Sequence, residues 1–206
     1  MTMVIGVVNY GMGNLHSILR KLKVIGVNYI LIETPEHFDE VDKVILPGVG
    51  HFGKAMENLK SKNLIDPLNK AILSDKKPIL GICLGMQLMS TFSEEGNKEG
   101  LGWIKGSVKR FEKSEDLRYK IPHMGWNNIS IEKESVLFKN IQDGAEFYFV
   151  HSFYFESGDV KVNLNSTNYI SSFISAFEQD NIYGVQYHPE KSFEAGNQLF
   201  KNFVNL

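Results

Sequence analysis

The first half of the chain alternates short apolar runs with longer amphipathic stretches. Short apolar runs suit buried strands, whereas apolar residues spaced three and four apart suit helices packed on those strands. The predicted strands of this half are residues 4–8, 28–32, 43–46 and 79–82. The predicted helices are residues 15–24, residues 55–73 with an interruption near Pro67, and a helix that follows Cys83. This alternation predicts an α/β fold with a mostly parallel central sheet and helices on both faces.

The second half shows shorter strand-like stretches that are separated by turns. Its predicted strands are residues 107–111, 119–122, 127–131 and 147–154, followed by a hairpin of residues 169–177 and 181–187. A polar loop is expected over residues 94–100, turns over residues 140–144 and 156–159, and a closing helix over residues 192–203. Such spacing predicts mixed or antiparallel strands here. The 206 residues are expected to form a single domain.

Cys83 lies where the buried run of residues 79–82 turns into a helix. Gly81 and Gly85 stand two residues before and after it, and small neighbours allow a sharp turn that holds the central residue in a strained conformation. The helix N-terminus stabilises a thiolate and leaves backbone N–H groups free for an oxyanion. The pattern predicts a nucleophile elbow with a thiol; a buried structural cysteine is the alternative that this stretch alone leaves open.

A second candidate segment, Gly184-Val-Gln-Tyr-His-Pro-Glu-Lys-Ser192, ends a predicted strand. Pro189 favours an extended conformation at His188, and residues i and i+2 of an extended segment project to the same side. Glu190 could then hold one nitrogen of the His188 ring while the other faces Cys83. The residues therefore predict a Cys-His-Glu triad that performs acyl transfer on a peptide, an amide side chain or a small ester.

Two glycine-rich turns follow strands of the first half. Residues 9–14 lack the third glycine of a dinucleotide-binding turn, because His16 stands there. Residues 47–54 nearly match a Walker A loop, but Ala55 replaces its Ser or Thr. A phosphate-binding module therefore remains an alternative, and residues 48–50 could instead present N–H groups to an oxyanion.

Composition narrows the classes of function. Hydrophobic residues make up 43% and charged residues 22% of the chain, and the formal net charge is −2, which does not favour a nucleic-acid groove. One cysteine excludes an internal disulfide and fits a reducing compartment. No apolar run approaches membrane-spanning length, and the N-terminus lacks the basic region of a signal peptide. We expect a cytoplasmic protein with no membrane or nucleic-acid partner and no cofactor. No metal is expected either, because no set of His, Cys, Asp and Glu residues has metal-ligand spacing.

Taken together, these segments resemble the class I (triad) glutamine amidotransferases. The matching stretches are Gly81-Ile-Cys-Leu-Gly-Met-Gln87, Pro47-Gly-Val-Gly50 and Tyr187-His-Pro-Glu190. Within that family the chain is most similar to the HisH branch, the glutaminase subunits of imidazole glycerol phosphate synthases. The stretches that carry this closer resemblance are Tyr10-Gly-Met-Gly-Asn14, Pro122-His-Met-Gly-Trp-Asn127 and His188-Pro-Glu-Lys-Ser192. The resemblance covers the chain from end to end and implies a flavodoxin-like fold.

The resemblance also implies roles for individual residues. Cys83 would attack the carboxamide of glutamine, His188 would shuttle the proton, and Glu190 would orient His188. The implied oxyanion hole consists of Gly48, Val49, Gly50 and the amide of Leu84. The implied glutamine pocket contains Gln87, His151 and Ser152, with Glu94 or Glu95 as a further neighbour. The implied partner interface or its signalling path contains Asn14, Trp126, Tyr148 and Lys191.

The implied partner is a HisF-type cyclase that receives ammonia for histidine biosynthesis. A partner is also expected without the resemblance. Glutamine hydrolysis wastes nitrogen unless another group captures the ammonia, and a chain of this length that is filled by a hydrolase core has no room for a domain that would accept it. Asn9 stands where the HisH pattern usually carries Asp, which leaves open a paralogue that supplies ammonia to a sugar-amidinating synthase for surface glycans. A cysteine peptidase of the same fold is a further alternative.

Overall fold

The computed structural model describes residues 3–206. Its helices are α1 (Leu15–Ile25), α2 (Phe52–Ser61), α3 (Ile65–Asn69), α4 (Leu84–Leu88) and α5 (Phe193–Val204). Its strands are β1 (Val4–Val8), β2 (Asn28–Ile32), β3 (Lys43–Gly48), β4 (Ile79–Cys83), β5 (Ser90–Ser93), β6 (Lys98–Glu99), β7 (Ile104–Arg110), β8 (His123–Asn128), β9 (Ser130–Ile131), β10 (Glu146–His151), β11 (Phe153–Glu156), β12 (Asn163–Asn168), β13 (Ser172–Gln179) and β14 (Ile182–Val185).

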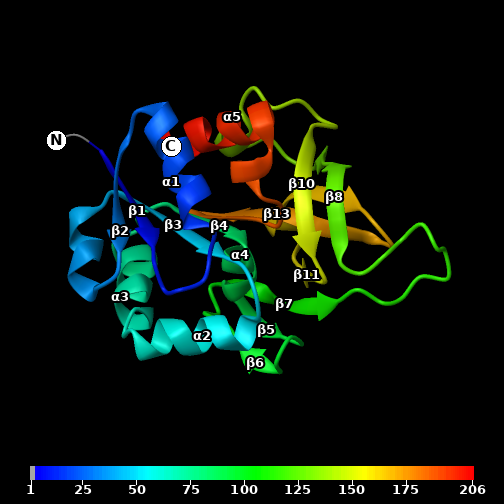
Figure 1. Ribbon diagram of the computed structural model, residues 1–206, viewed down its shortest axis with the longest axis horizontal. Helices are drawn as coiled ribbons and strands as arrows, with labels where there is room; N and C mark the ends of the chain where they lie inside the picture. The colour runs from blue at the N-terminus through cyan, green and yellow to red at the C-terminus, as the bar shows by residue number, and fades with distance from the viewer. Residues whose placement is uncertain (1–2) are drawn as a thin grey trace.

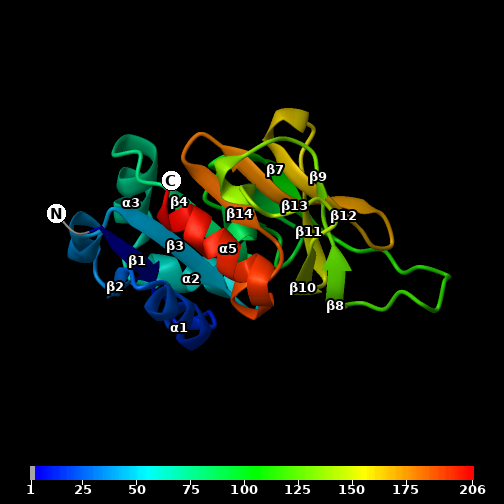
Figure 2. The same cartoon turned by 90° about the horizontal axis from the view of Figure 1, so that it is seen from above.

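The main sheet joins a parallel part to a largely antiparallel part. Its strand order is β2-β1-β3-β4-β14-β13-β11-β7-β5-β6; in addition, β12 pairs with β13, and β9 pairs with β12. The first five strands in this order run parallel, and β14 begins the antiparallel pairing through its hairpin with β13. Strands β8 and β10 form a separate antiparallel pair. Figure 2 shows the parallel strands and the antiparallel strands as two adjoining parts of the molecule.

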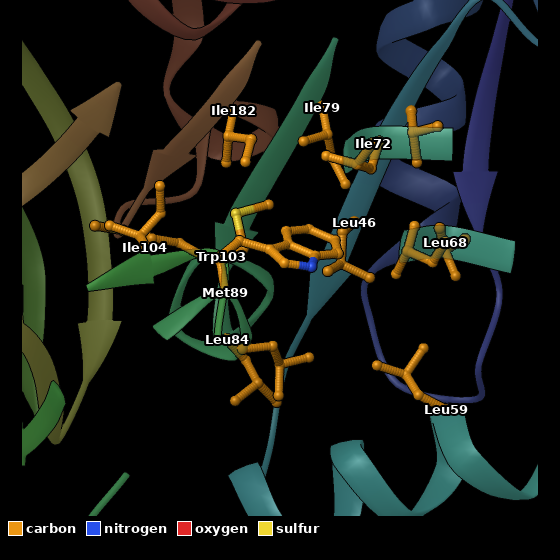
Figure 3. Packing of buried hydrophobic residues seen from close by; sticks show 14 of the residues in the cluster. Leu46, Leu59, Leu68, Ile72, Ile79, Leu84, Met89, Trp103, Ile104 and Ile182 are labelled. Atoms are coloured by element: carbon orange, nitrogen blue, oxygen red, sulfur yellow. The ribbon is translucent and has the colours of Figure 1, made fainter. Parts of the chain in front are cut away.

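Helices cover both faces of the parallel strands, and each face has its own core. In Figure 1, α1 and α5 lie above the sheet, and α2 and α3 lie below it. Alternation along β3 explains the division, because Val44 and Leu46 pack with α2, α3 and α4, whereas Ile45 packs with α1 and α5. Figure 3 shows the first core, in which Trp103 lies among aliphatic side chains from β3, β4 and α3. The predicted α/β class with a covered, mostly parallel sheet and later antiparallel strands is confirmed.

Several predicted elements of the second half are wrong in detail. Residues 119–122 form no strand but end a long loop over residues 111–122, which projects from the molecule in Figure 2. The predicted strand over residues 147–154 breaks at Ser152 into β10 and β11, which belong to different sheets. The predicted strand over residues 127–131 breaks likewise between β8 and β9. Strand β12 was not predicted, because it is rich in Asn, Ser and Thr and shows no apolar alternation.

Two differences also occur in the first half. The helix predicted over residues 55–73 is interrupted at residues 62–64, and Pro67 lies in the first turn of α3, where its missing N–H costs no hydrogen bond. The predicted loop over residues 94–100 contains β6, which pairs with β5. Nowhere in residues 3–206 does a helix combine the length and the apolar character needed to cross a bilayer.

Candidate active site

Cys83 sits at a sharp turn between β4 and α4, as the sequence predicts. Its backbone has φ 54° and ψ −110°, a conformation that non-glycine residues rarely adopt. A Cβ at Gly81 would lie 2.8 Å from the backbone nitrogen of Met86, and a Cβ at Gly85 would overlap the carbonyl oxygen of Leu46. The turn is therefore possible only because both flanking residues are glycine.

His188 and Glu190 form a buried pair beside this turn. His188 Nδ1 lies 2.8 Å from Glu190 Oε1, and each side chain is 1% exposed. Strand β14 runs parallel to β4, with Val185 opposite Ile82, and this register brings the segment after β14 to the Cys83 edge. The predicted pairing is confirmed, but its predicted cause is wrong: Pro189–Lys191 is a turn of 3-10 helix, not an extended segment.

The electrostatics of the pair favour a charged imidazole. Burial alone lowers the pKa of His188, but its interactions with Cys83 and the hydrogen bond that it donates to Glu190 raise it to about 10. The Nε2 atom of His188 is buried, and within residues 3–206 it has no hydrogen-bond partner. In its charged form, His188 has an Nε2–H group that is free to serve a reacting group near Cys83.

A cavity of about 280 Å³ opens over Cys83. Its lining residues are Val49, Gly50, Cys83, Leu84, Gln87, Glu95, Pro122, Val150, His151, Ser152, Phe153 and His188. The structure thus brings together residues from both halves of the chain. Glu95 lines the cavity and Glu94 does not; the Glu94 carboxylate accepts a hydrogen bond from the backbone N–H of Arg110 instead. Glu190 stands behind His188, and Gly48 pairs with Cys83 across β3 and β4.

The loop of residues 48–50 forms one rim of this cavity. The hydroxyl of Tyr10, which is fully buried, donates a 2.7 Å hydrogen bond to the carbonyl oxygen of Pro47 and ties the base of the loop. Gly50 adopts φ 108°, which a residue with a side chain would rarely adopt. At the start of α2, the Glu95 carboxylate accepts a 2.7 Å hydrogen bond from the N–H of Phe52. A carboxylate therefore occupies the helix N-terminus that a phosphate would need.

The predicted partner residues fall in two places. Trp126 contacts Tyr148 with ring centroids 5.9 Å apart, and Lys191 Nζ lies 5.3 Å from the Tyr148 ring centroid. Phe193, which sequence reasoning missed, stacks on Trp126 at 5.0 Å and is 72% exposed. Asn14 precedes α1 and is not among the contacts of this aromatic cluster.

Sequence reasoning also missed two buried polar residues next to the cavity. His123 lies 3.0 Å from His151, ring nitrogen to ring nitrogen, and Gln186 Nε2 lies 3.6 Å from Cys83 Sγ. The sequence did contain an indication for Gln186: it is a polar residue at the end of an apolar strand, and that strand leads to the segment that carries His188. In the part of the chain that the structure describes, no three His, Cys, Asp or Glu residues are grouped to hold a metal ion.

Comparison with known proteins identifies the family. Residues 6–206 match the family model described as "Glutamine amidotransferase class-I". The chain therefore belongs to the class I glutamine amidotransferases, and the predicted resemblance is confirmed.

The relatives narrow this class further. The chain is 46% identical to "Imidazole glycerol phosphate synthase subunit HisH 2" of Methanococcus maripaludis, over 97% of this chain and 98% of that one. It is 43% identical to the protein of the same description from Pseudomonas aeruginosa, with the same coverage. Within the class I family the chain is thus of the HisH type. The structure of PurLQS from Thermotoga maritima, 20% identical with a TM-score of 0.76 over 100% of this chain and 99% of that one, supports the fold.

Proposed function

We propose that this chain hydrolyses glutamine to glutamate and ammonia, and that residues 1–206 act as a single glutamine amidotransferase domain. One observation carries the proposal: a thiol at a strained strand–helix turn faces the same cavity as a buried His188–Glu190 pair. A thiolate, a protonated imidazole and an orienting carboxylate are the groups that acyl transfer from an amide requires.

The chemistry proceeds in two stages. The Cys83 thiolate attacks the side-chain carbonyl carbon of glutamine, a C–S bond forms, and an electron pair moves to the carbonyl oxygen. The N–H of Leu84 at the start of α4 and the N–H groups of residues 48–50 stabilise that oxyanion. His188 protonates the nitrogen, ammonia leaves, and a thioester remains. A water molecule that loses its proton to His188 then cleaves the thioester, releases glutamate and restores the thiol.

The rest of the cavity fits an amino acid. Glu95 is the acidic residue among those that line the cavity. We assign its carboxylate to binding the α-ammonium group of glutamine. Gln87 and Ser152 supply further polar contacts. Burial lowers the pKa of His151 to about 3, and both of its ring nitrogens are within hydrogen-bond distance of protein atoms. We therefore assign His151 to the wall of the pocket as a neutral group.

The partner we propose is a HisF-type cyclase that uses the ammonia to form imidazole glycerol phosphate and AICAR in histidine biosynthesis. The HisH type of the relatives supports this partner. The exposed cluster of Trp126 and Phe193, with Lys191 against Tyr148, offers the aromatic and cationic side chains that are enriched at protein interfaces. Glutamine hydrolysis by the chain alone is expected to be weak.

A specific observation favours a second candidate partner, a sugar-amidinating synthase. The M. maripaludis and P. aeruginosa relatives are described as "HisH 2", which implies a second HisH-like protein in each organism. Asn9 donates a 2.7 Å hydrogen bond from Nδ2 to Glu33 Oε1, so an Asp at this position would put two carboxylates together. Asn9, which stands where the HisH pattern usually carries Asp, therefore fits beside Glu33 better than an Asp would.

The test measures glutamine hydrolysis by the chain alone, with a HisF-type cyclase, and with a sugar-amidinating synthase. Strong stimulation by the cyclase in the presence of its nucleotide substrate supports the histidine pathway, and stimulation by the synthase alone supports the second candidate. Peptide cleavage without any glutamine turnover would contradict both and support a cysteine peptidase.

A further inference from the structure

We propose that Gln186 is a further catalytic residue of this site, because its side-chain amide donates a hydrogen bond to the sulfur of Cys83. The inference rests on the proposed glutaminase chemistry and adds a group to it. Gln186 is fully buried and stands one residue beyond Val185, the last residue of β14, which lies opposite Ile82 on β4. Its Nε2 atom lies 3.6 Å from Cys83 Sγ, a normal separation for a hydrogen bond to sulfur.

The orientation of the Gln186 amide is fixed by its neighbours. Gln87 Nε2 lies 2.9 Å from the carbonyl oxygen of Phe153 and 2.9 Å from Gln186 Oε1. A backbone carbonyl can only accept, so the amide nitrogen of Gln87 must face Phe153. That nitrogen then donates its second hydrogen to Gln186 Oε1. The remaining end of the Gln186 amide, its NH₂ group, is left facing Cys83.

A pair of neutral histidines on the separate strand pair β8 and β10 supports the same arrangement. The Phe153 carbonyl also lies 2.8 Å from His151 Nδ1, which must donate to it. His151 Nε2 is then an acceptor, and His123 Nδ1 donates to it across 3.0 Å. Asn127 Nδ2 lies 3.2 Å from His123 Nε2 and completes the chain of donors. Donor and acceptor are therefore fixed for each hydrogen bond that links Asn127, His123, His151 and the Phe153 carbonyl.

The arrangement gives the thiolate a donor that never titrates. His188 supports the thiolate only while it is protonated, and it gives up that proton during the reaction. The Gln186 amide keeps its hydrogens throughout, so it stabilises negative charge on Sγ and holds the sulfur in place when His188 becomes neutral. A buried neutral amide also avoids the cost of a second buried cation.

The test uses the full chain and the pH dependence of Cys83 alkylation by iodoacetamide. Cys83 is the one cysteine of the sequence, so the alkylation rate reports on this thiol alone. Gln186→Met keeps the length of the side chain and removes the donor. Gln198→Met is the matched control, since Gln198 on α5 bonds Asn202 and lies outside the cavity lining. Gln186→Glu repeats the test with an isosteric side chain that carries negative charge.

We expect the midpoint of the rate–pH curve to rise by about one pH unit in Gln186→Met, by more in Gln186→Glu, and not at all in Gln198→Met. The midpoint is the proper readout, because a less acidic thiol is intrinsically more nucleophilic and the rate at one pH understates the change. An unchanged midpoint in both Gln186 variants, each with a thermal unfolding transition like that of the unsubstituted chain, overturns the inference.

Glutamine turnover is measured on the same preparations to separate the two claims. Turnover by the unsubstituted chain together with unchanged midpoints contradicts only the role of Gln186. Absence of turnover by the chain alone, with a HisF-type cyclase and with a sugar-amidinating synthase contradicts the proposed function, while a raised midpoint in Gln186→Met still supports the hydrogen bond to Cys83.

Discussion

The parallel strands and the antiparallel strands contribute to the cavity in different ways. The parallel part supplies backbone geometry: the strained turn at Cys83, the N–H groups at the start of α4, and the loop after β3. The antiparallel strands supply side-chain chemistry: the separate pair of β8 and β10 carries His123 and His151, and residues 150–153 form a wall of the cavity. The segment after β14 joins the two, because β14 pairs with β4 on one side and with β13 on the other.

The parallel strands and the antiparallel strands tolerate different substitutions. Where function depends on backbone conformation, a single methyl group is enough to disrupt the site. Where function depends on buried hydrogen bonds, substitution changes the pH dependence or the rate before it changes the fold. Substitutions in the two groups of strands, taken in order of decreasing effect, test this distinction.

Gly85→Ala is expected to abolish folding of the parallel part. A Cβ at Gly85 would overlap the carbonyl oxygen of Leu46, a backbone atom that cannot rotate away. Destabilisation by about 4 kcal/mol or more is expected, seen as loss of the cooperative thermal transition. Gly158→Ala is the control in the antiparallel part, where a Cβ meets no atom within 4 Å. A stable, active Gly85→Ala protein would show that the turn is not as tight as the structure has it.

Glu190→Gln is expected to lower glutamine turnover by about a thousandfold while leaving the fold intact. The carboxylate accepts from His188 Nδ1, and an amide in its place favours the wrong tautomer and no longer supports the imidazolium. Turnover is measured by glutamate release in the presence of the partner. Glu194→Gln, an exposed change in the first turn of α5, should be neutral. Equal activities of the two variants would remove Glu190 from the mechanism.

Local features of the site could be predicted from sequence, whereas contacts between distant segments could not. Cys83, Gly85 and the His188–Glu190 pair were predictable, because a strand-to-helix turn and a short-range pair are local features of the chain. The His123–His151 pair was not, because it depends on the pairing of β8 with β10, where His123 lies opposite His151. The wrong strand over residues 119–122 and the break at Ser152 have the same origin: which sheet a strand joins is settled by contacts distant in sequence.

His123→Gln is expected to make stability less sensitive to acid. Burial lowers the pKa of His123 to about 4, so folding favours its neutral form. The resulting stability is present above the usual pKa of about 6.5 and is lost as the pH falls towards 4. Between pH 8 and pH 5 the unsubstituted chain should lose about 2 kcal/mol more unfolding free energy than the variant.

Urea unfolding at the two pH values measures this difference, and His188 cancels because both proteins contain it. His16→Gln, at an exposed position on α1, should follow the unsubstituted chain. Identical pH dependence of the unsubstituted chain and His123→Gln would show that protonation of His123 does not lower the unfolding free energy.

Trp126→Ala is expected to weaken binding of a HisF-type cyclase by about tenfold and to leave the fold unchanged. Trp126 is 43% exposed and stacks on the more exposed Phe193, so its truncation removes contact area from the surface rather than from a core. Titration calorimetry gives the affinity. Phe92→Ala, an exposed aromatic on β5, is the matched control and should bind normally. Equal affinities would place the interface elsewhere.

The proposed chemistry requires that Cys83 attack a glutamine bound in the cavity over the turn between β4 and α4. Its most direct test is intact-mass spectrometry of the chain after incubation with an electrophilic glutamine analogue, with and without excess glutamine. We expect a single adduct that is absent in Cys83→Ala and forms more slowly when glutamine competes. No adduct on a chain whose thiol still reacts with iodoacetamide would contradict it, because the thiol would then be reactive but the cavity would not bind glutamine.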